Sequence, residues 1–166
     1  MEIKWTPWRR AFVKGEEKPK DDRCVLCAKH EEHHDAENLV LERGGTCYVL
    51  LNLYPYNPGH LMVVPYEHTA SFESLAPEVA AELMALTQRS VAILQKAMRP
   101  DGFNLGMNLG RVAGAGIDQH LHMHVVPRWS GDTNFMPIIG ETRLIPEALD
   151  DTYAELRALF SQENPA

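Results

Sequence analysis

Three of the eight histidines in this 166-residue chain occupy alternate positions, at His120, His122 and His124. Imidazole can bind a metal ion, attack an electrophile or transfer a proton near neutral pH. Successive side chains of a β-strand point to opposite faces, so a strand over 120–127 would line one face with these rings. The apolar residues between them would then face a core. Three chance core histidines are a poor explanation, since each buried ring would need its own polar partner.

The residues alone leave two kinds of chemistry open for this histidine row. A catalytic zinc ion can be held by three histidines, two of them from one strand. Alternatively, one histidine is a nucleophile that its neighbours support. Neutral imidazole suits the second reading, because its ordinary pKa lies near 6.5. A carbonyl that accepts a hydrogen bond from Nδ1–H would aim the Nε2 lone pair at the substrate.

Cys24 and Cys27 form a second chemical motif, two thiols with two residues between them. Redox dithiols share this spacing, but they open a helix in a strand–helix–strand setting that this sequence does not show. Two such thiolates can also bind one tetrahedral zinc ion if imidazoles complete the set, and His68 and His120 are the candidates. The spacing alone does not decide whether such a Cys2His2 site exists.

The glycine-rich segment 110–116 lies just before the histidine row. It lacks the Gly-Lys-Ser/Thr of a Walker loop and the glycine spacing of a dinucleotide fingerprint. A plain turn is one reading of it. The other is a loop whose backbone N–H groups face a phosphate.

The elements that must position these groups follow an α+β pattern. A long helix is predicted over 77–98, where Pro77 and Glu78 suit the first turn and an apolar stripe recurs at helical spacing. A last helix is predicted over 146–160. Apolar runs between turn residues predict an antiparallel sheet of about five strands, with Gly44-Gly45 as a hairpin turn. Besides the histidine strand, these are 38–43, 46–51, 60–65 and 103–109.

Composition narrows the class of protein. The length fits one domain, and the net charge of −7 argues against general binding to nucleic acid or to an anionic membrane. A small phosphate ligand stays compatible, since backbone N–H groups can hold it. No apolar run is long enough for a transmembrane helix, and no secretory leader is evident. The odd count of three cysteines then predicts a reducing cytoplasm.

The segment His120-Leu-His122-Met-His124-Val-Val resembles the His-x-His-x-His-hydrophobic-hydrophobic signature of the histidine triad (HIT) nucleotide hydrolases and transferases. Residues 52–65 are similar to that superfamily's segment between two central strands, and 102–108 to the strand before its phosphate loop. The resemblance covers roughly residues 20–140. Within the superfamily, 127–135 looks most like the branch of Fhit-type hydrolases and bacterial diadenosine tetraphosphate (Ap4A) phosphorylases.

The resemblance implies a HIT fold, with an N-terminal arm over 1–23, the HIT domain over 24–140 and a C-terminal helical extension over 141–166. It implies cleavage of dinucleoside polyphosphates through a nucleotidyl-histidine, with phosphorolysis to ADP and ATP favoured. The alternatives are hydrolysis by water, an adenosine phosphoramidase and a non-catalytic nucleotide sensor. The implied partners are nucleotides, inorganic phosphate and further copies of the chain in a homodimer or larger assembly.

Residue by residue, the resemblance implies that His122 is the nucleophile and that His124 contacts the phosphate and assists the leaving group. His60 would support them from behind. Asn52 would bind the ribose and Leu53 the base. The residues implied to hold phosphate oxygens are Asn108, Gly114, Ala115, Gly116 and Ile117.

Zinc-containing members of the superfamily use two early cysteines and two histidines. The matching positions in this chain are Cys24, Cys27, His68 and His120. The resemblance therefore implies a structural Zn²⁺, with no metal needed by the catalytic residues. Fhit itself lacks the early cysteines, and the chain departs from Fhit there.

Overall fold

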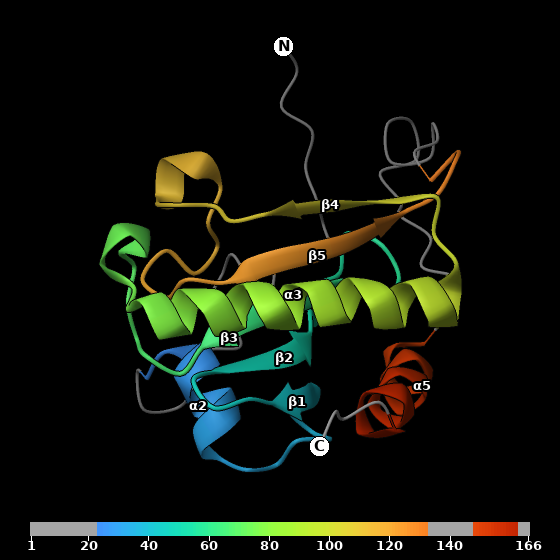
Figure 1. Cartoon of the computed structure of the whole chain (residues 1–166), viewed down its shortest axis with the longest axis horizontal. Coiled ribbons are helices and arrows are strands. Elements are labelled where there is room, and N and C mark those ends of the chain that lie inside the picture. Colours follow the sequence, from blue (N-terminus) through green and yellow to red (C-terminus); the bar gives the residue numbers. More distant parts are fainter. Residues whose placement is uncertain (1–22, 133–147, 163–166) are drawn as a thin grey trace.

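The sheet that carries the histidines has five antiparallel strands in the order β1-β2-β3-β5-β4 (Figure 1). The computed structural model describes residues 23–132 and 148–162. The predicted α+β architecture is confirmed. The strands are β1 (Val40–Arg43), β2 (Cys47–Leu51), β3 (Leu61–Pro65), β4 (Gly102–Gly106) and β5 (Met123–Arg128).

The two faces of the sheet have different coverings. Alternate residues such as Val49, Val63 and Val125 pack against α3 (Pro77–Met98) and α5 (Leu149–Gln162). The intervening side chains, among them Tyr48 and Met62, form a second cluster with the short helix α2 (Val25–Glu31). Because both faces are buried, β2 and β3 consist of continuously buried residues. Figure 1 shows α3 lying along one face, with α5 beside it.

The second face is the one that carries the catalytic candidates. His124 pairs with Met62 across the β3–β5 ladder. Directly paired residues of antiparallel strands share a face, so His124 points away from α3. On this strand the predicted alternation holds, since Met123 and Val125 belong to the α3 side.

A carboxylate of α3 fastens the β1–β2 hairpin to the helix. Glu82 accepts hydrogen bonds from the backbone N–H groups of Gly45, Thr46 and Cys47 and from the Thr46 hydroxyl. A Cβ atom on Gly44 would lie 2.5 Å from Glu82 Oε1. The predicted glycine turn is therefore confirmed, but the physical reason for glycine at this position is the close approach of a helix side chain.

The histidine strand is shorter than predicted. β5 begins at Met123, so only His124 of the three histidines lies within it. The reason is that the chain before Met123 makes other bonds: Leu121 N–H donates to the carbonyl of Thr69, and His120 Nε2 to that of Pro65. The idea of three histidines along one strand is thus wrong for His120 and His122.

Other boundaries shift by a few residues. β4 ends at Gly106, and the glycine-rich segment contains a 3-10 turn, η3 (Arg111–Ala113). The helix α3 has its predicted bounds. The predicted arm 1–23 lies outside the described residues except for Arg23, as do 133–147 and 163–166. Among the described helices, none has the length and apolar character to span a membrane.

Candidate active site and metal centre

His122 has the geometry of a nucleophile. Its Nδ1 lies 2.8 Å from the main-chain carbonyl oxygen of His120, an acceptor only, so Nδ1 carries the proton and donates it. The Nε2 atom of the neutral ring then holds a lone pair. The side chain of His122 is buried, and this burial lowers its pKa from the ordinary value of 6.5. The ring is therefore neutral, and able to attack, at pH 7.

A chain of hydrogen bonds fixes the tautomer of His124. The backbone N–H of Tyr56 donates to His60 Nδ1 at 3.0 Å, so His60 carries its proton on Nε2. That atom lies 2.9 Å from His124 Nδ1 and donates to it. A neutral His124 must then carry its proton on Nε2, the tautomer that can donate to a phosphate or bridging oxygen. His60 is fully buried, which places it behind the reacting groups.

Asn52 joins this chain from the other side. Its Oδ1 accepts the Tyr54 backbone N–H at 2.9 Å, and its Nδ2 lies 3.4 Å from His60 Nδ1. The next residue, Leu53, is 42% exposed. The structure thus brings the predicted ribose residue to the histidines and leaves the predicted base residue at the surface beside it.

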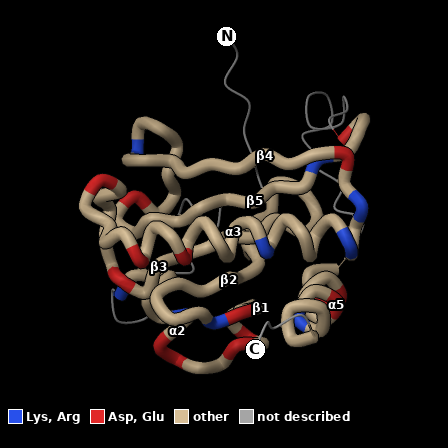
Figure 2. Tube along the Cα trace, in the orientation of Figure 1, with Lys and Arg blue, Asp and Glu red and all other residues tan. Residues whose placement is uncertain are grey.

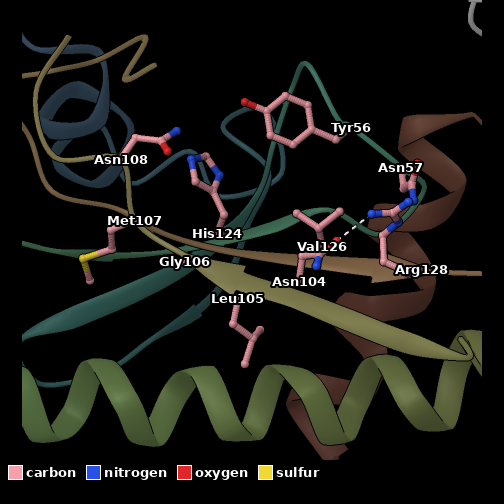
Figure 3. A pocket seen from close by; sticks show the side chains of 10 residues that line it. All are labelled: Tyr56, Asn57, Asn104, Leu105, Gly106, Met107, Asn108, His124, Val126 and Arg128. Carbon is pink, nitrogen blue, oxygen red and sulfur yellow. Dashed lines mark hydrogen bonds between the residues drawn. The ribbon is translucent and has the colours of Figure 1, made fainter. Parts of the chain in front are cut away.

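The rings of His122 and His124 are close neighbours, with centroids 4.8 Å apart in an edge-on arrangement. His124 also lines a pocket of about 430 Å³, together with the predicted phosphate residue Asn108 (Figure 3). Residues 114–117 and Leu53 do not line this pocket. Their roles in binding substrate stay predictions.

The pocket contains residues that the sequence reasoning did not assign. They come from the β2–β3 loop (Tyr56, Asn57), from β4 (Asn104) and from β5 (Val126, Arg128). A signal for two of them was present, because a period of two continued from His124 along β5 reaches Val126 and then Arg128 on the same face.

A second cluster lies at the opposite end of the histidine row. One ligand atom from each of Cys24, Cys27, His68 and His120 lies within 4.8 Å of all the others. Cys27 Sγ is 3.3 Å from His68 Nδ1 and 3.5 Å from His120 Nδ1, and Cys24 Sγ is 3.4 Å from His120 Nδ1. The predicted four residues are therefore brought together.

These distances fit one tetrahedral zinc ion. With Zn–S near 2.3 Å and Zn–N near 2.0 Å, the sulfur–nitrogen edge of a tetrahedron measures about 3.5 Å. The orientation of His120 also fits, because its Nε2–H donates to the Pro65 carbonyl at 2.9 Å and leaves Nδ1 to face the sulfurs.

Without a bound cation, the side chains of the cluster favour their neutral forms. Burial and the adjacent Cys24 raise the pKa of Cys27 to about 11, so two thiolates side by side are unfavourable without a positive charge. Burial lowers the pKa of His120 to about 4, which keeps it neutral as a ligand must be. The donor set and its spacing suit Zn²⁺, which would stabilise the thiolate form of both cysteines.

Comparison with known proteins agrees with this geometry. The family model described as HIT domain matches residues 33–131, which include the whole triad. The chain belongs to the HIT-domain family. It is 46% identical over 153 residues to a Mycobacterium tuberculosis protein named AP-4-A phosphorylase, covering 89% of this chain and 78% of that protein.

Two further similar proteins bear on the site. Adenosine 5′-monophosphoramidase hnt1 of Schizosaccharomyces pombe is 33% identical, over 63% of this chain and 74% of its own. The crystal structure of a zinc-bound histidine triad family protein from Mycobacterium smegmatis superimposes with a TM-score of 0.68 at 29% identity, covering 84% of this chain and 94% of that one.

Proposed function

We propose that this protein is a nucleotidyl transferase that cleaves diadenosine tetraphosphate by phosphorolysis. His122 Nε2 attacks the α-phosphorus, forming a P–N bond while the bond to the bridging oxygen breaks. The leaving group is ATP, whose developing charge accepts the hydrogen bond of His124 Nε2–H. Inorganic phosphate then attacks the same phosphorus, giving ADP and returning the electron pair to His122.

One observation carries this proposal: the carbonyl of His120 holds His122 in the tautomer whose Nε2 can attack. Phosphoryl-type transfer depends mostly on positioning and charge stabilisation. The His60–His124 bond supplies the second positioned group. The similarity to the AP-4-A phosphorylase supports phosphate, rather than water, as acceptor.

In this proposal Asn108 and the backbone of 114–117 bind phosphate oxygens, while Asn52 and Leu53 bind ribose and base. A structural Zn²⁺ is bound by Cys24, Cys27, His68 and His120, where it would supply positive charge and cross-link α2 to the turn before β5. The groups that the protein contributes to the reaction are the side chains of His122 and His124, and the zinc site has a structural role in this proposal. We expect a homodimer or larger assembly in the cytoplasm, as HIT proteins commonly form.

The deciding experiment incubates the protein with Ap4A with and without inorganic phosphate and separates the products. ADP plus ATP, formed only when phosphate is present, is the expected result. AMP plus ATP at equal rates in both tubes would establish hydrolysis instead.

The phosphoramidase relative motivates a second arm with adenosine 5′-phosphoramidate. A kcat/KM for the phosphoramidate above that for Ap4A would replace the proposed substrate. Tight binding of Ap4A without turnover of any substrate would favour a nucleotide sensor.

A further inference from the structure

The pocket beyond His124 is lined on the β4 side by Gly106 and Asn104, and Gly102 continues the same strand face. Across the β4–β5 ladder, Gly106 pairs with His124, Asn104 with Val126 and Gly102 with Arg128. Paired residues share a face of the sheet. Because glycine has no side chain, Asn104 is the one residue of these three in β4 that places a side chain on the face of His124. A Cβ atom added to either glycine would meet nothing within 4 Å. The strand thus leaves an open trough alongside His124, Val126 and Arg128.

The two ends of this trough are polar. Figure 3 shows Asn108 and Tyr56 gathered around His124, and Asn104 and Arg128 together at the other end, joined by a hydrogen bond of 2.6 Å. Leu105 points to the opposite side, toward the helix. His124 and Arg128 lie four strand residues apart, which is about 13 Å. The donors at the two ends of the trough suit an elongated ligand that carries hydrogen-bond acceptors.

Arg128 is held in a fixed orientation. Its Nη2 donates to Asp132 Oδ1 at 2.8 Å and its Nε to Asp132 Oδ2 at 2.5 Å, a bidentate pair. Asp132 also accepts from the Asn57 amide at 2.8 Å, so its charge is shared among several donors. The guanidinium has five N–H groups. Two of them donate to Asp132 and one donates to Asn104. The other two make no hydrogen bond to the described residues.

We propose that the trough between His124 and Arg128 is the subsite for the phosphates of the leaving nucleotide, and that Arg128 binds their far end. This inference rests on the proposed function. In the proposed function the α-phosphate reacts at His122. The remaining phosphates of the dinucleotide must therefore pass His124 and extend away from the adenylyl half. From His124 the trough continues along β5 through Val126 to Arg128, away from His122. A fixed guanidinium is well matched to phosphate oxygens.

A purely structural role is the competing explanation, because the Arg128–Asp132 pair also closes the turn after β5. The two differ in what they predict for substrates. If Arg128 only stabilises the turn, its loss lowers kcat/KM for every substrate alike. If Arg128 binds polyphosphate, its loss lowers kcat/KM only for substrates whose leaving group carries phosphates.

The test compares Arg128→Gln with wild type on two substrates that share the adenylyl half: Ap4A with phosphate, and the 4-nitrophenyl ester of AMP. We expect kcat/KM for Ap4A to fall about 10- to 100-fold, as for loss of hydrogen bonds to a charged group, and that for the ester to stay within about threefold. Calorimetry with inorganic tripolyphosphate should show binding to wild type and a matching loss in the variant. Lys96→Gln, an exposed lysine on α3, controls for charge.

Equal losses on both substrates, or no loss on Ap4A, would overturn the subsite. So would tripolyphosphate binding that is unaffected by Arg128→Gln. Asn104→Ala is a second variant that keeps the Arg128–Asp132 pair, so it tests the subsite even if Arg128→Gln misfolds. It should lower kcat/KM for Ap4A but not for the ester, with a smaller loss than Arg128→Gln. If wild type turns over neither substrate but binds tripolyphosphate through Arg128, the proposed function fails and the subsite stands.

Discussion

The Nδ1 atom of His122 lies 2.8 Å from the main-chain oxygen of His120, whose own ring faces the sulfurs of Cys24 and Cys27. One residue therefore takes part in both candidate centres: its side chain lies in the Cys2His2 cluster, and its carbonyl accepts the hydrogen bond of the proposed nucleophile. Any change that moves the backbone at His120 also moves the acceptor that sets the tautomer of His122.

Loss of the metal cluster should impair both stability and catalysis. We expect Cys24→Ser to lower the zinc content of the purified protein from about one ion per chain to well below half, because one of four ligands is lost. The thermal midpoint and kcat should fall with it. Zinc content by atomic emission is the primary measurement. Cys47→Ser is the matched control, since Cys47 is a buried cysteine outside the cluster. Full zinc content in Cys24→Ser would contradict the assignment.

Removal of the nucleophile should abolish the covalent step. His122→Ala should lower kcat by at least about 10³-fold and yield no acid-labile nucleotidyl-protein after brief reaction with labelled Ap4A. His34→Ala removes an exposed histidine and should retain both. Retention of zinc in His122→Ala is also expected, and loss of zinc in that variant would revive the catalytic three-histidine site.

The acid limb of activity should lie below the ordinary histidine range. Only the neutral ring of His122 can attack, and burial lowers its pKa from 6.5. As the pH falls, the neutral fraction therefore persists until the lowered pKa is reached. We expect kcat/KM for Ap4A, which reports the first half-reaction, to stay level down to pH 6.5 and to fall only at lower pH. A limb centred above pH 6.5 would show that another group controls the attack.

The carboxylate of Glu82 should stabilise the fold in a pH-dependent way. Burial opposes its ionisation, but hydrogen bonds from Thr46 and from three backbone N–H groups outweigh burial and lower its pKa from 4.5. Its contribution is thus complete above pH 4.5 and is lost as the pH falls through the lowered value. Glu82→Gln should reduce the free energy of unfolding by about 1–3 kcal/mol at pH 7, and by less below pH 4.5. Urea titrations at both pH values test this, with Glu155→Gln, an exposed glutamate in the middle of α5, as control.

Two adjacent glycines offer a sharper test of the same contact. A Cβ at Gly44 would lie 2.5 Å from Glu82 Oε1 and 2.9 Å from the Cys47 carbonyl, whereas one at Gly45 would lie 3.6 Å from Oε1. Gly44→Ala should therefore lower the free energy of unfolding by about 1–3 kcal/mol, as overpacking does, and Gly45→Ala by much less. Equal losses of unfolding free energy in the two variants, measured by urea titration, would mean that the Glu82 carboxylate does not lie in close contact with Gly44.

Local pattern was sufficient for most of the fold. The bounds of α3 followed from Pro77 and a regular apolar stripe, and the sheet followed from short apolar runs. The start of β5 could not be read in this way. Alternation continues through His120 and His122, but bonds to Pro65 and Thr69, distant in sequence, take the chain out of the ladder.

The same distinction applies to the site. Residue types and spacing named candidate ligands around Cys24 and His120 but left the cluster undecided, and the resemblance to zinc-containing HIT proteins was needed to expect it. The role of Asp132 in orienting Arg128 does not follow from residue types, since it depends on a turn geometry that spacing alone leaves open. Nor does the open space beside Gly106, whose position next to His124 depends on the pairing of β4 with β5.

That open space makes the width of the site adjustable by single substitutions. Gly106 faces empty space beside His124 and adopts a backbone conformation that other residues tolerate, so a larger side chain there would narrow the trough without disturbing the sheet. On the proposed role of the trough, a substitution on this one edge strand would change the length and bulk of the leaving group that the protein accepts, and the histidines with their hydrogen bonds would stay as they are.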